Sequence, residues 1–399
     1  MYFAILKHHK ISYHLKYTKK IANNQVLAKL KTTQNQFMKL INRIFIVAIG
    51  TLFIFSGAIK INDPIGTAIK LEEYFDVFST DFTPLFKHLV PFSLYFSLFL
   101  CAFEIILGIA LIVNFRRKTM ILSSLAMIVF FTFLTFYSAY FNKVTDCGCF
   151  GAVISLRPWQ SFSKDIALLI PLLLLTLQIK KFDNTQSVFS FLAVILATIL
   201  SFGVGIQAVN HLPLWDTSDY KVGNHIPTLM KPTEPCKFTY IMEKDGKKVE
   251  FENYPTDTTY IYKEMITLNP EKCKARITDY SIWRDTINFT QESFEGRKLI
   301  FIITNSNKVN KSDKKLFEII NKLAIKAQNE QNMAAIVCTA SIGDEYEVFA
   351  KTVGLQLPYY FSDAKVLKTM MRSNVGVFLM ENGVVKGKWH QNDVEKVKF

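Results

Sequence analysis

Long apolar runs alternate with short polar connections over the first half of the chain, and a mixed pattern follows. A helix that crosses a bilayer needs about 20 mostly apolar residues. The pattern therefore predicts five membrane helices, at Ile44–Ile61, Leu89–Val113, Thr119–Phe141, Ile166–Ile179 and Val188–Ala208. The fourth run is short, so we expect its helix to begin near Phe162, with Lys164 and Asp165 at the interfacial end.

After residue 210 the pattern becomes that of a soluble domain. The stretches "KLIFIIT" and "MAAIVCTA" predict two buried strands, and the segment between them repeats apolar residues at helical spacing. Asp245-Gly246 and Asn382-Gly383 are dipeptides that favour tight hairpin turns. A succession of strand, helix, strand, helix and hairpin predicts an α/β domain at 210–399.

Basic residues gather at particular connections. The first 43 residues contain nine Lys or Arg and no acidic residue, and further clusters follow the second span, at Arg116–Lys118, and the fourth, at Lys180–Lys181. Positively charged connections tend to stay in the cytoplasm. This predicts a cytoplasmic N-terminus in a bacterial inner membrane. The loops at 62–88 and 142–161 and the C-terminal domain would then be periplasmic.

The net charge of +14 does not by itself indicate nucleic-acid binding, because no nucleic-acid-binding motif accompanies it. The stretch "MKLINRIFIVAIG", from Met38, has the features of a complete membrane-protein start. Residues 1–40 are therefore interpreted as a basic cytoplasmic arm. The alternative is an upstream extension from a misplaced start codon.

The stretch "VTDCGCFGAV" places Cys147 and Cys149 just after the third span. A Cys-x-Cys pair closes a small, strained ring, and strain makes a disulfide easier to reduce. With Asp146 beside it, this spacing favours a redox-active dithiol. A structural disulfide, inert thiols or a metal-linked pair are the alternatives, although the loop has no histidine and zinc usually takes four ligands.

Glu104 lies inside the second span. An ionisable side chain at this depth is unfavourable unless it is paired or carries protons, so Glu104 is a functional candidate. The alternative is a neutral, hydrogen-bonded Glu in a helix contact. Cys101, one turn earlier, is interpreted as a packing residue, as is Cys338 in a predicted core strand.

Cys236 and Cys273 are candidates for a structural disulfide in the outer domain. The alternative is that one of them exchanges with the Cys147–Cys149 pair. The seven histidines are dispersed, and no metal site is predicted.

Three motifs together resemble the MauE/DoxX family of redox-associated membrane proteins. They are "GAIKINDP" after the first span, "CAFEIILGIALI" in the second and "DCGCFG" after the third, and the resemblance covers about 41–179. It implies a four-helix membrane bundle at 41–181, followed here by a fifth helix at 186–209. It also implies periplasmic thiol chemistry at Cys147 and Cys149, with a quinone as the cofactor in some members.

The domain at 210–399 resembles thioredoxin-like domains, with "VGNHIPTL" near its entry and "RSNVGVFLMENGVVKGKW" as its closing hairpin. The redox Cys-x-x-Cys of such domains would follow the strand Leu299–Thr304, where this chain reads "NSNKVNKS". Val375 stands where a cis-proline is expected. We therefore expect this domain to perform no thiol exchange.

Two functions are predicted from these features. The first is thiol-disulfide exchange at Cys147–Cys149 with a periplasmic thiol protein, with Glu104 or Asp146 moving protons. The second is a non-enzymatic, membrane-anchored docking or assembly protein of the cell envelope. In both, the partners are the lipid bilayer and an envelope protein.

Overall fold

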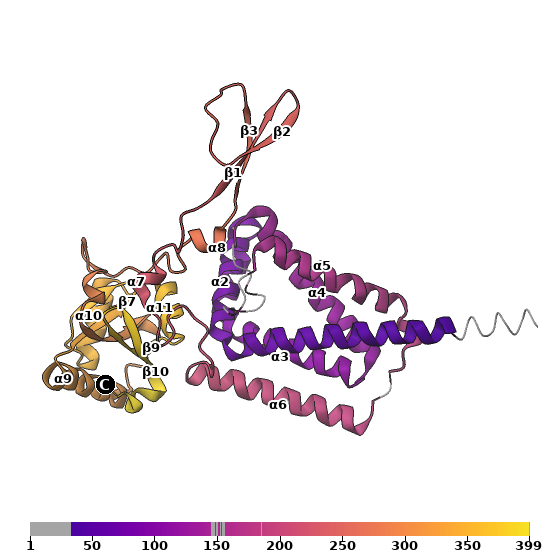
Figure 1. The fold of residues 1–399 in the computed structure, drawn as a ribbon. Coiled ribbons are helices and arrows are strands. Elements are labelled where there is room, and N and C mark those ends of the chain that lie inside the picture. The colour runs from indigo at the N-terminus through magenta and orange to yellow at the C-terminus, as the bar shows by residue number, and fades with distance from the viewer. Residues whose placement is uncertain are drawn as a thin grey trace, which may run out of the picture. The chain divides into compact units, whose positions relative to one another are not determined.

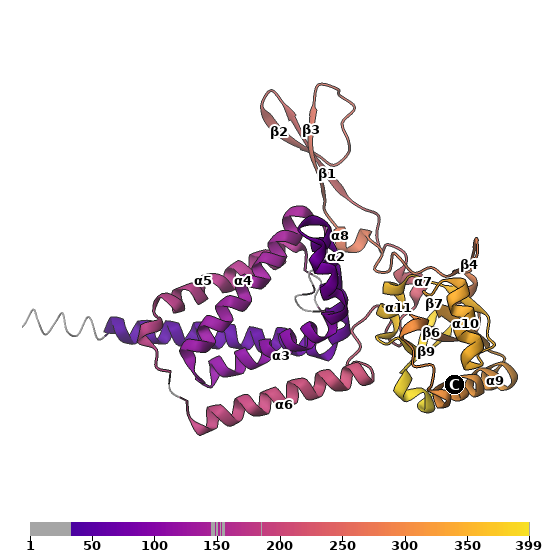
Figure 2. The same ribbon diagram turned by 180° about the vertical axis from the view of Figure 1, so that it is seen from behind.

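The computed structural model describes residues 33–144, 148, 151, 153, 156–184 and 186–398, with the side chains of 270 and 271 excepted. The described residues form two compact units. Of the described residues, the first unit comprises 33–58, 99–144, 148, 156–184 and 186–201, and the second comprises 59–98, 151, 153 and 202–398. Figures 1 and 2 show the elements from opposite sides.

Within the described residues, five helices are long and apolar enough to cross a membrane, as predicted. They are Thr33–Asn62, Pro84–Ile112, Arg117–Phe141 (α4), Pro158–Leu177 (α5) and Val188–Asn210 (α6). The second consists of a 3₁₀ segment, Pro84–Phe92 (η1), and a helix, Ser93–Ile112 (α3). α5 begins at Pro158 rather than near Phe162, because proline is well suited to the first helical position.

Close packing of the first two spans shapes the first unit. A Cβ atom at Gly108 would lie 2.5 Å from the carbonyl oxygen of Gly50, so both positions need the smallest residue. Membrane helices associate through such close contacts between small residues. The apolar core comprises Ile46, Ile49, Phe53, Leu107, Leu111, Ile121, Met127, Ile128, Leu168, Leu172, Leu175 and Phe182.

The connection between the first two spans is helical, which corrects the prediction of a loop at 62–88. The helix α2 covers Pro64–Asp81, with Asp63 as its N-cap. The Asp63 side chain accepts a hydrogen bond from the backbone N–H of Gly66 at 2.9 Å. Asp63 and Pro64 therefore mark the end of the first span and the start of the next helix. α2 buries Ala68, Ile69, Leu71, Tyr74 and Phe78, which recur at helical spacing.

The C-terminal α/β domain is built on a seven-stranded sheet with the order β10-β9-β6-β7-β8-β4-β5. β7 is parallel to β6 and β8, and β9 is antiparallel to β6 and β10. The strands are Trp283–Arg284 (β4), Ile287–Asn288 (β5), Arg297–Ile303 (β6), Ala334–Thr339 (β7), Tyr359–Phe361 (β8), Val375–Glu381 (β9) and Val384–His390 (β10).

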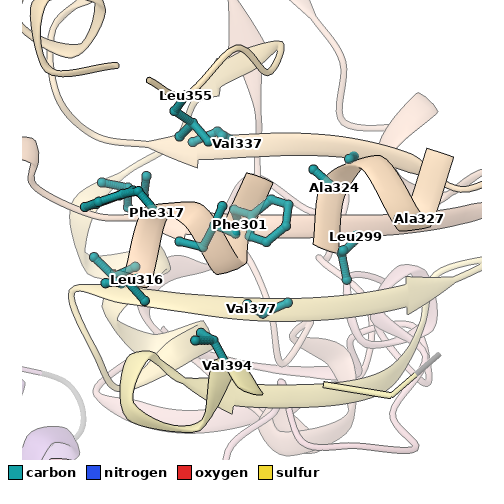
Figure 3. Close-up of a cluster of buried hydrophobic side chains, with 14 of the residues drawn as sticks. Leu299, Phe301, Leu316, Phe317, Ala324, Ala327, Val337, Leu355, Val377 and Val394 are labelled. Atoms are coloured by element: carbon teal, nitrogen blue, oxygen red, sulfur yellow. The ribbon is translucent and has the colours of Figure 1, made fainter. Parts of the chain in front are cut away.

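Helices cover both faces of this sheet. Figure 3 shows Leu316 and Phe317 of α9 among Phe301, Val337 and Val377 of the central strands. The opposite face packs on α11, because alternate residues of a strand point to opposite sides. The helical segments of the domain are Ile226–Leu229 (α7), Pro270–Cys273 (α8), Glu292–Phe294 (η3), Ser306–Lys308 (η4), Lys314–Gln331 (α9), Gly343–Val353 (α10), Ala364–Met371 (α11) and Gln391–Lys396 (η5).

A smaller, three-stranded sheet with the order β2-β1-β3 precedes the seven-stranded one. Its strands are Phe238–Lys244 (β1), Lys247–Phe251 (β2) and Ile261–Thr267 (β3). Asp245 and Gly246 form the predicted turn, both with positive φ. Met242 is the one buried residue of these three strands, so the sheet has almost no core of its own.

Candidate functional site

The predicted dithiol lies in the connection between α4 and α5. Asp146, Cys147 and Cys149 fall outside the described residues, so their geometry stays a prediction. Two neighbours are described: Gly148 and Gly151 have φ of 63° and 54°, a left-handed conformation that suits glycine. Before them, α4 ends at Phe141, and the Ser138 hydroxyl donates a hydrogen bond to the Val144 carbonyl.

Glu104 is buried in the first unit, with 4% of its surface exposed. The hydroxyl of Ser56, on the first span, donates a hydrogen bond to Glu104 Oε1 at 2.9 Å. Cys101, one turn earlier on α3, is a free, buried cysteine, and the chain packs tightly there: a Cβ at Gly57 would lie 3.0 Å from the Cys101 carbonyl oxygen. The Glu104 carboxyl group and the Ser56 hydroxyl therefore form a hydrogen bond inside an apolar bundle.

A second buried carboxyl group was not predicted as a site residue. Asp165 is fully buried. Its Oδ2 accepts a hydrogen bond from the Thr135 hydroxyl at 2.9 Å, and the Lys164 ammonium lies 2.7 Å from its Oδ1. Because α5 begins at Pro158, Asp165 lies about 10 Å inside the helix by helical rise, not at its interfacial end. Pro158, a residue that often begins a helix, was the sequence signal that would have placed Asp165 inside the span.

The loop after β6 carries amide and hydroxyl groups where a Cys-x-x-Cys was considered. Asn305 and Asn374 are joined by two hydrogen bonds: Asn305 N–H donates to Asn374 Oδ1 at 2.9 Å, and Asn374 Nδ2 donates to the Asn305 carbonyl at 3.0 Å. Ser306 donates to Ser341 Oγ through its N–H and its hydroxyl, both at 2.9 Å. These contacts hold three loops at the end of β6 in place but supply no thiol.

The C-terminal domain contains one disulfide and one buried free cysteine among its described residues. Cys236 and Cys273 are joined in a disulfide, with their Cα atoms 4.6 Å apart. Cys338 is buried in β7, and burial raises the pKa of its thiol to about 12. Since the thiolate is the nucleophile, Cys338 is a core residue. Within the described ranges there is also no group of three or more His, Cys, Asp or Glu side chains placed to hold a metal ion.

Comparison with known proteins supports a MauE-like membrane domain. The family model described as methylamine utilisation protein MauE matches residues 38–178. A second model, described as a domain of unknown function (DUF8463), matches residues 236–268, which include the three-stranded sheet. Protein TlpB of Flavobacterium psychrophilum is 28% identical over 160 residues, which are 39% of this chain and 41% of that protein. The chain thus matches less than half the length of this relative.

Together these findings describe a multi-pass membrane protein with a MauE-like domain and a sheet-rich C-terminal domain. The matched range contains Glu104, Asp165 and the predicted dithiol.

Proposed function

We propose that this protein exchanges thiols and disulfides at Cys147 and Cys149, at the periplasmic side of a bacterial inner membrane. The observation that carries the proposal is the MauE match, since its range holds both cysteines together with the buried Glu104–Ser56 pair. The dithiol follows the third span in the sequence, whereas Cys101 and Cys338 are buried.

The exchange involves two successive displacements. A thiolate of the partner attacks one sulfur of the Cys147–Cys149 disulfide, the S–S bond breaks, and a mixed disulfide forms while the released cysteine takes up a proton. The partner's second thiolate then attacks the mixed disulfide. The partner leaves oxidised, and both cysteines are left as thiols, so the pair has accepted two electrons and two protons.

Protons must reach or leave the dithiol in each turnover. Asp146 is adjacent in sequence and is the proposed local acceptor. Glu104 is proposed as a proton carrier within the bundle, because a buried carboxyl group with a hydroxyl partner can serve in either protonation state. Asp165 joins them as a candidate, since it is buried in the helix that follows the dithiol loop.

Electrons taken up by the pair need an acceptor. A membrane quinone is the class that the family resemblance implies. In the described part of the bundle no arrangement of side chains singles out a quinone site, so this acceptor rests on the resemblance alone.

The C-terminal domain is proposed to be a thioredoxin-like module that lies in the periplasm and has lost its redox centre. The β10-β9-β6-β7 order, the parallel β6–β7 pair and the helices on both faces support this fold. The Asn305–Asn374 and Ser306–Ser341 contacts support the loss of thiol chemistry. They also favour the second candidate function, a docking or assembly protein that performs no exchange.

Trapping of a mixed disulfide tests the exchange. Cys147→Ser and Cys149→Ser variants, produced in cells and quenched with acid, each leave one thiol of the pair. We expect one of them to carry a partner protein in a disulfide-linked, reductant-sensitive adduct. A Cys101→Ser variant, which retains the pair, is the control and should accumulate none. Absence of an adduct in both single variants would favour the docking function.

A further inference from the structure

Two helices of the second unit meet through opposite charges. The acidic residues Asp63, Glu72 and Glu73 lie at the start of α2 and along it, and the basic residues Lys365, Lys368 and Arg372 lie along α11 and at its end. The pairs are Asp63–Arg372 at 2.9 Å, Glu72–Lys368 at 2.7 Å and Glu73–Lys365, in direct contact. The order of the partners along α2 is the reverse of their order along α11, although the two helices are far apart in sequence. The helices lie side by side in both views (Figures 1 and 2).

Asp63–Arg372 is the least exposed of the three pairs. Arg372 is 6% exposed, and its Nε lies 3.0 Å from both carboxylate oxygens of Asp63. The same guanidinium donates to the carbonyls of Lys368 and Thr369. Arg372 ends α11 with φ of 54°, a conformation in which Gly or Asn would be less strained. The backbone strain at Arg372 is offset by the contacts of its side chain, which indicates that the positive charge is required at this position.

The segment that leads into the domain is bound at the same place. Asn62 Nδ2 donates to the Trp215 carbonyl at 2.8 Å, and Trp215 N–H donates to Asn62 Oδ1 at 3.1 Å. The next residue, Asp216, accepts a hydrogen bond at 2.7 Å from Lys388 of β10, whose side chain is buried. Asn62 therefore holds the entry segment while its neighbour Asp63 holds α11.

We propose that α2 is the docking site of the C-terminal α/β domain, and that its acidic residues bind the basic face of α11 from the same chain. In this arrangement the Asn62-Asp63-Pro64 segment ends a span, caps α2 and anchors the domain. The domain is then held by α2 as well as by its covalent connection to α6. This inference does not depend on thiol exchange at Cys147 and Cys149.

The domain that binds α2 belongs to the same chain. The segment that connects α6 to this domain is short, and contacts hold it along its length. About ten residues separate the end of α6 from Tyr220, a reach of roughly 35 Å when extended. Within that stretch Asn210 accepts a hydrogen bond from Asn392 at 2.7 Å, and Trp215 is held by Asn62. A domain from another copy would have to replace these contacts.

Zero-length cross-linking of the full chain in native membranes tests the docking. A water-soluble carbodiimide joins a carboxylate to an amine only where the two touch. We expect tryptic peptides that link Glu72 to Lys368 and Glu73 to Lys365. The Lys315–Glu395 pair, 2.7 Å apart within the α/β domain, gives an internal cross-link that reports whether that domain is folded.

Asp63→Asn is the decisive variant, because asparagine still caps α2 but has no negative charge to form the ion pair with Arg372. We expect loss of both helix–helix cross-links while the Lys315–Glu395 link persists. Asp76→Asn removes an exposed carboxylate elsewhere on α2 and should change nothing. Undiminished cross-links in Asp63→Asn would overturn the proposed anchor. In a mixture of isotopically labelled and unlabelled chains, cross-links between the two would overturn the same-chain assignment.

Discussion

At the scale of single residues, the Asp63 carboxylate makes two interactions, and both require it to lie in the same position. It caps α2 through the Gly66 N–H and pairs with Arg372. A capping interaction contributes about 1 kcal/mol, and the loss of one partner of an ion pair costs up to about 3–5 kcal/mol when the pair is fully buried. Asp63–Arg372 is largely shielded from water, so its loss costs a part of that range. The anchoring role is therefore the larger of the two.

Gly66→Ala tests how tightly that carboxylate is held. A Cβ at Gly66 would lie 2.4 Å from Asp63 Oδ2, so the carboxylate must shift. Alanine favours a helix over glycine by about 1 kcal/mol, but we expect the lost contacts to outweigh this gain by about 1–2 kcal/mol. Thermal unfolding of the purified full chain measures the difference. Gly203→Ala, at a helical position with open space, is the control and should be neutral or stabilising.

His390 is predicted to make the α/β domain sensitive to acid. Burial lowers the pKa of this histidine from 6.5 to about 4. The negative charge of Asp393 acts to raise this pKa, and His211 acts to lower it further. Its Nδ1 accepts a hydrogen bond from the Asn392 N–H, which requires the neutral ring. Below pH 6.5 the unfolded chain binds a proton that the folded chain does not. Stability is therefore lost as the pH falls from 6.5 to about 4.

The expected loss is about 2 kcal/mol, since each pKa unit is worth about 1.4 kcal/mol and solvent screens part of the effect. Urea unfolding of the domain in the full chain, followed by pulse proteolysis at pH 7 and pH 4.5, measures it. In His390→Gln we expect a smaller drop between these two pH values. An equal drop in both proteins would contradict the assignment to His390.

At the scale of elements, the three-stranded sheet depends on its covalent closure. Met242 is its one buried strand residue, whereas the Cys236–Cys273 disulfide closes a segment with a sequence separation of 37. The chain-entropy model gives about 4 kcal/mol for a loop of this size. We expect Cys236→Ser/Cys273→Ser to expose β1–β3 to proteases while the seven-stranded sheet stays resistant.

Limited proteolysis with mass mapping checks this, with and without reductant. Reductant should act on the wild-type protein as the double substitution does, and should have no further effect on the double variant. Cleavage confined to other loops would show that the sheet is stable without its disulfide.

The elements that were predicted from sequence are those with strong local signals. The spans follow from their apolar length, and the Asn382-Gly383 hairpin from two residues that tolerate positive φ. α2 was missed because charged residues interrupt its apolar stripe. The short strands β4, β5 and β8 were missed because they are defined by pairing with distant segments, which no local pattern reveals.

The candidate site was predicted less completely. Glu104 was identified because a charge within an apolar run is conspicuous. Asp165 was placed at a helix end because the apolar run begins only after it, whereas α5 begins earlier, at Pro158. Arg372 gave no signal of its own, since its role arises from contact with a residue more than 300 positions earlier.

At the scale of the whole molecule, the distribution of basic residues predicts the orientation in the membrane. The clusters at Arg116–Lys118 and Lys180–Lys181 should be cytoplasmic and the C-terminal domain periplasmic. A membrane-impermeant maleimide applied to intact spheroplasts tests this with Lys248→Cys on β2 and Lys180→Cys, both at exposed positions.

We expect Lys248→Cys to react at once and Lys180→Cys only after permeabilisation. The protein without either substitution is labelled in parallel, to measure the reaction of its native cysteines. The reverse pattern would place the α/β domain in the cytoplasm, where a periplasmic thiol partner has no access to it.

The redox state of Cys147 and Cys149 in growing cells tests the central claim most directly. Acid-quenched cells are treated with a mass-shift alkylating reagent before and after reduction, and a Cys147→Ser/Cys149→Ser variant identifies the bands that belong to the pair. The account predicts a mixture of dithiol and disulfide that shifts with the oxidant supply. A pair that stays in one state under every growth condition would contradict thiol-disulfide exchange and leave this protein a membrane-anchored docking protein.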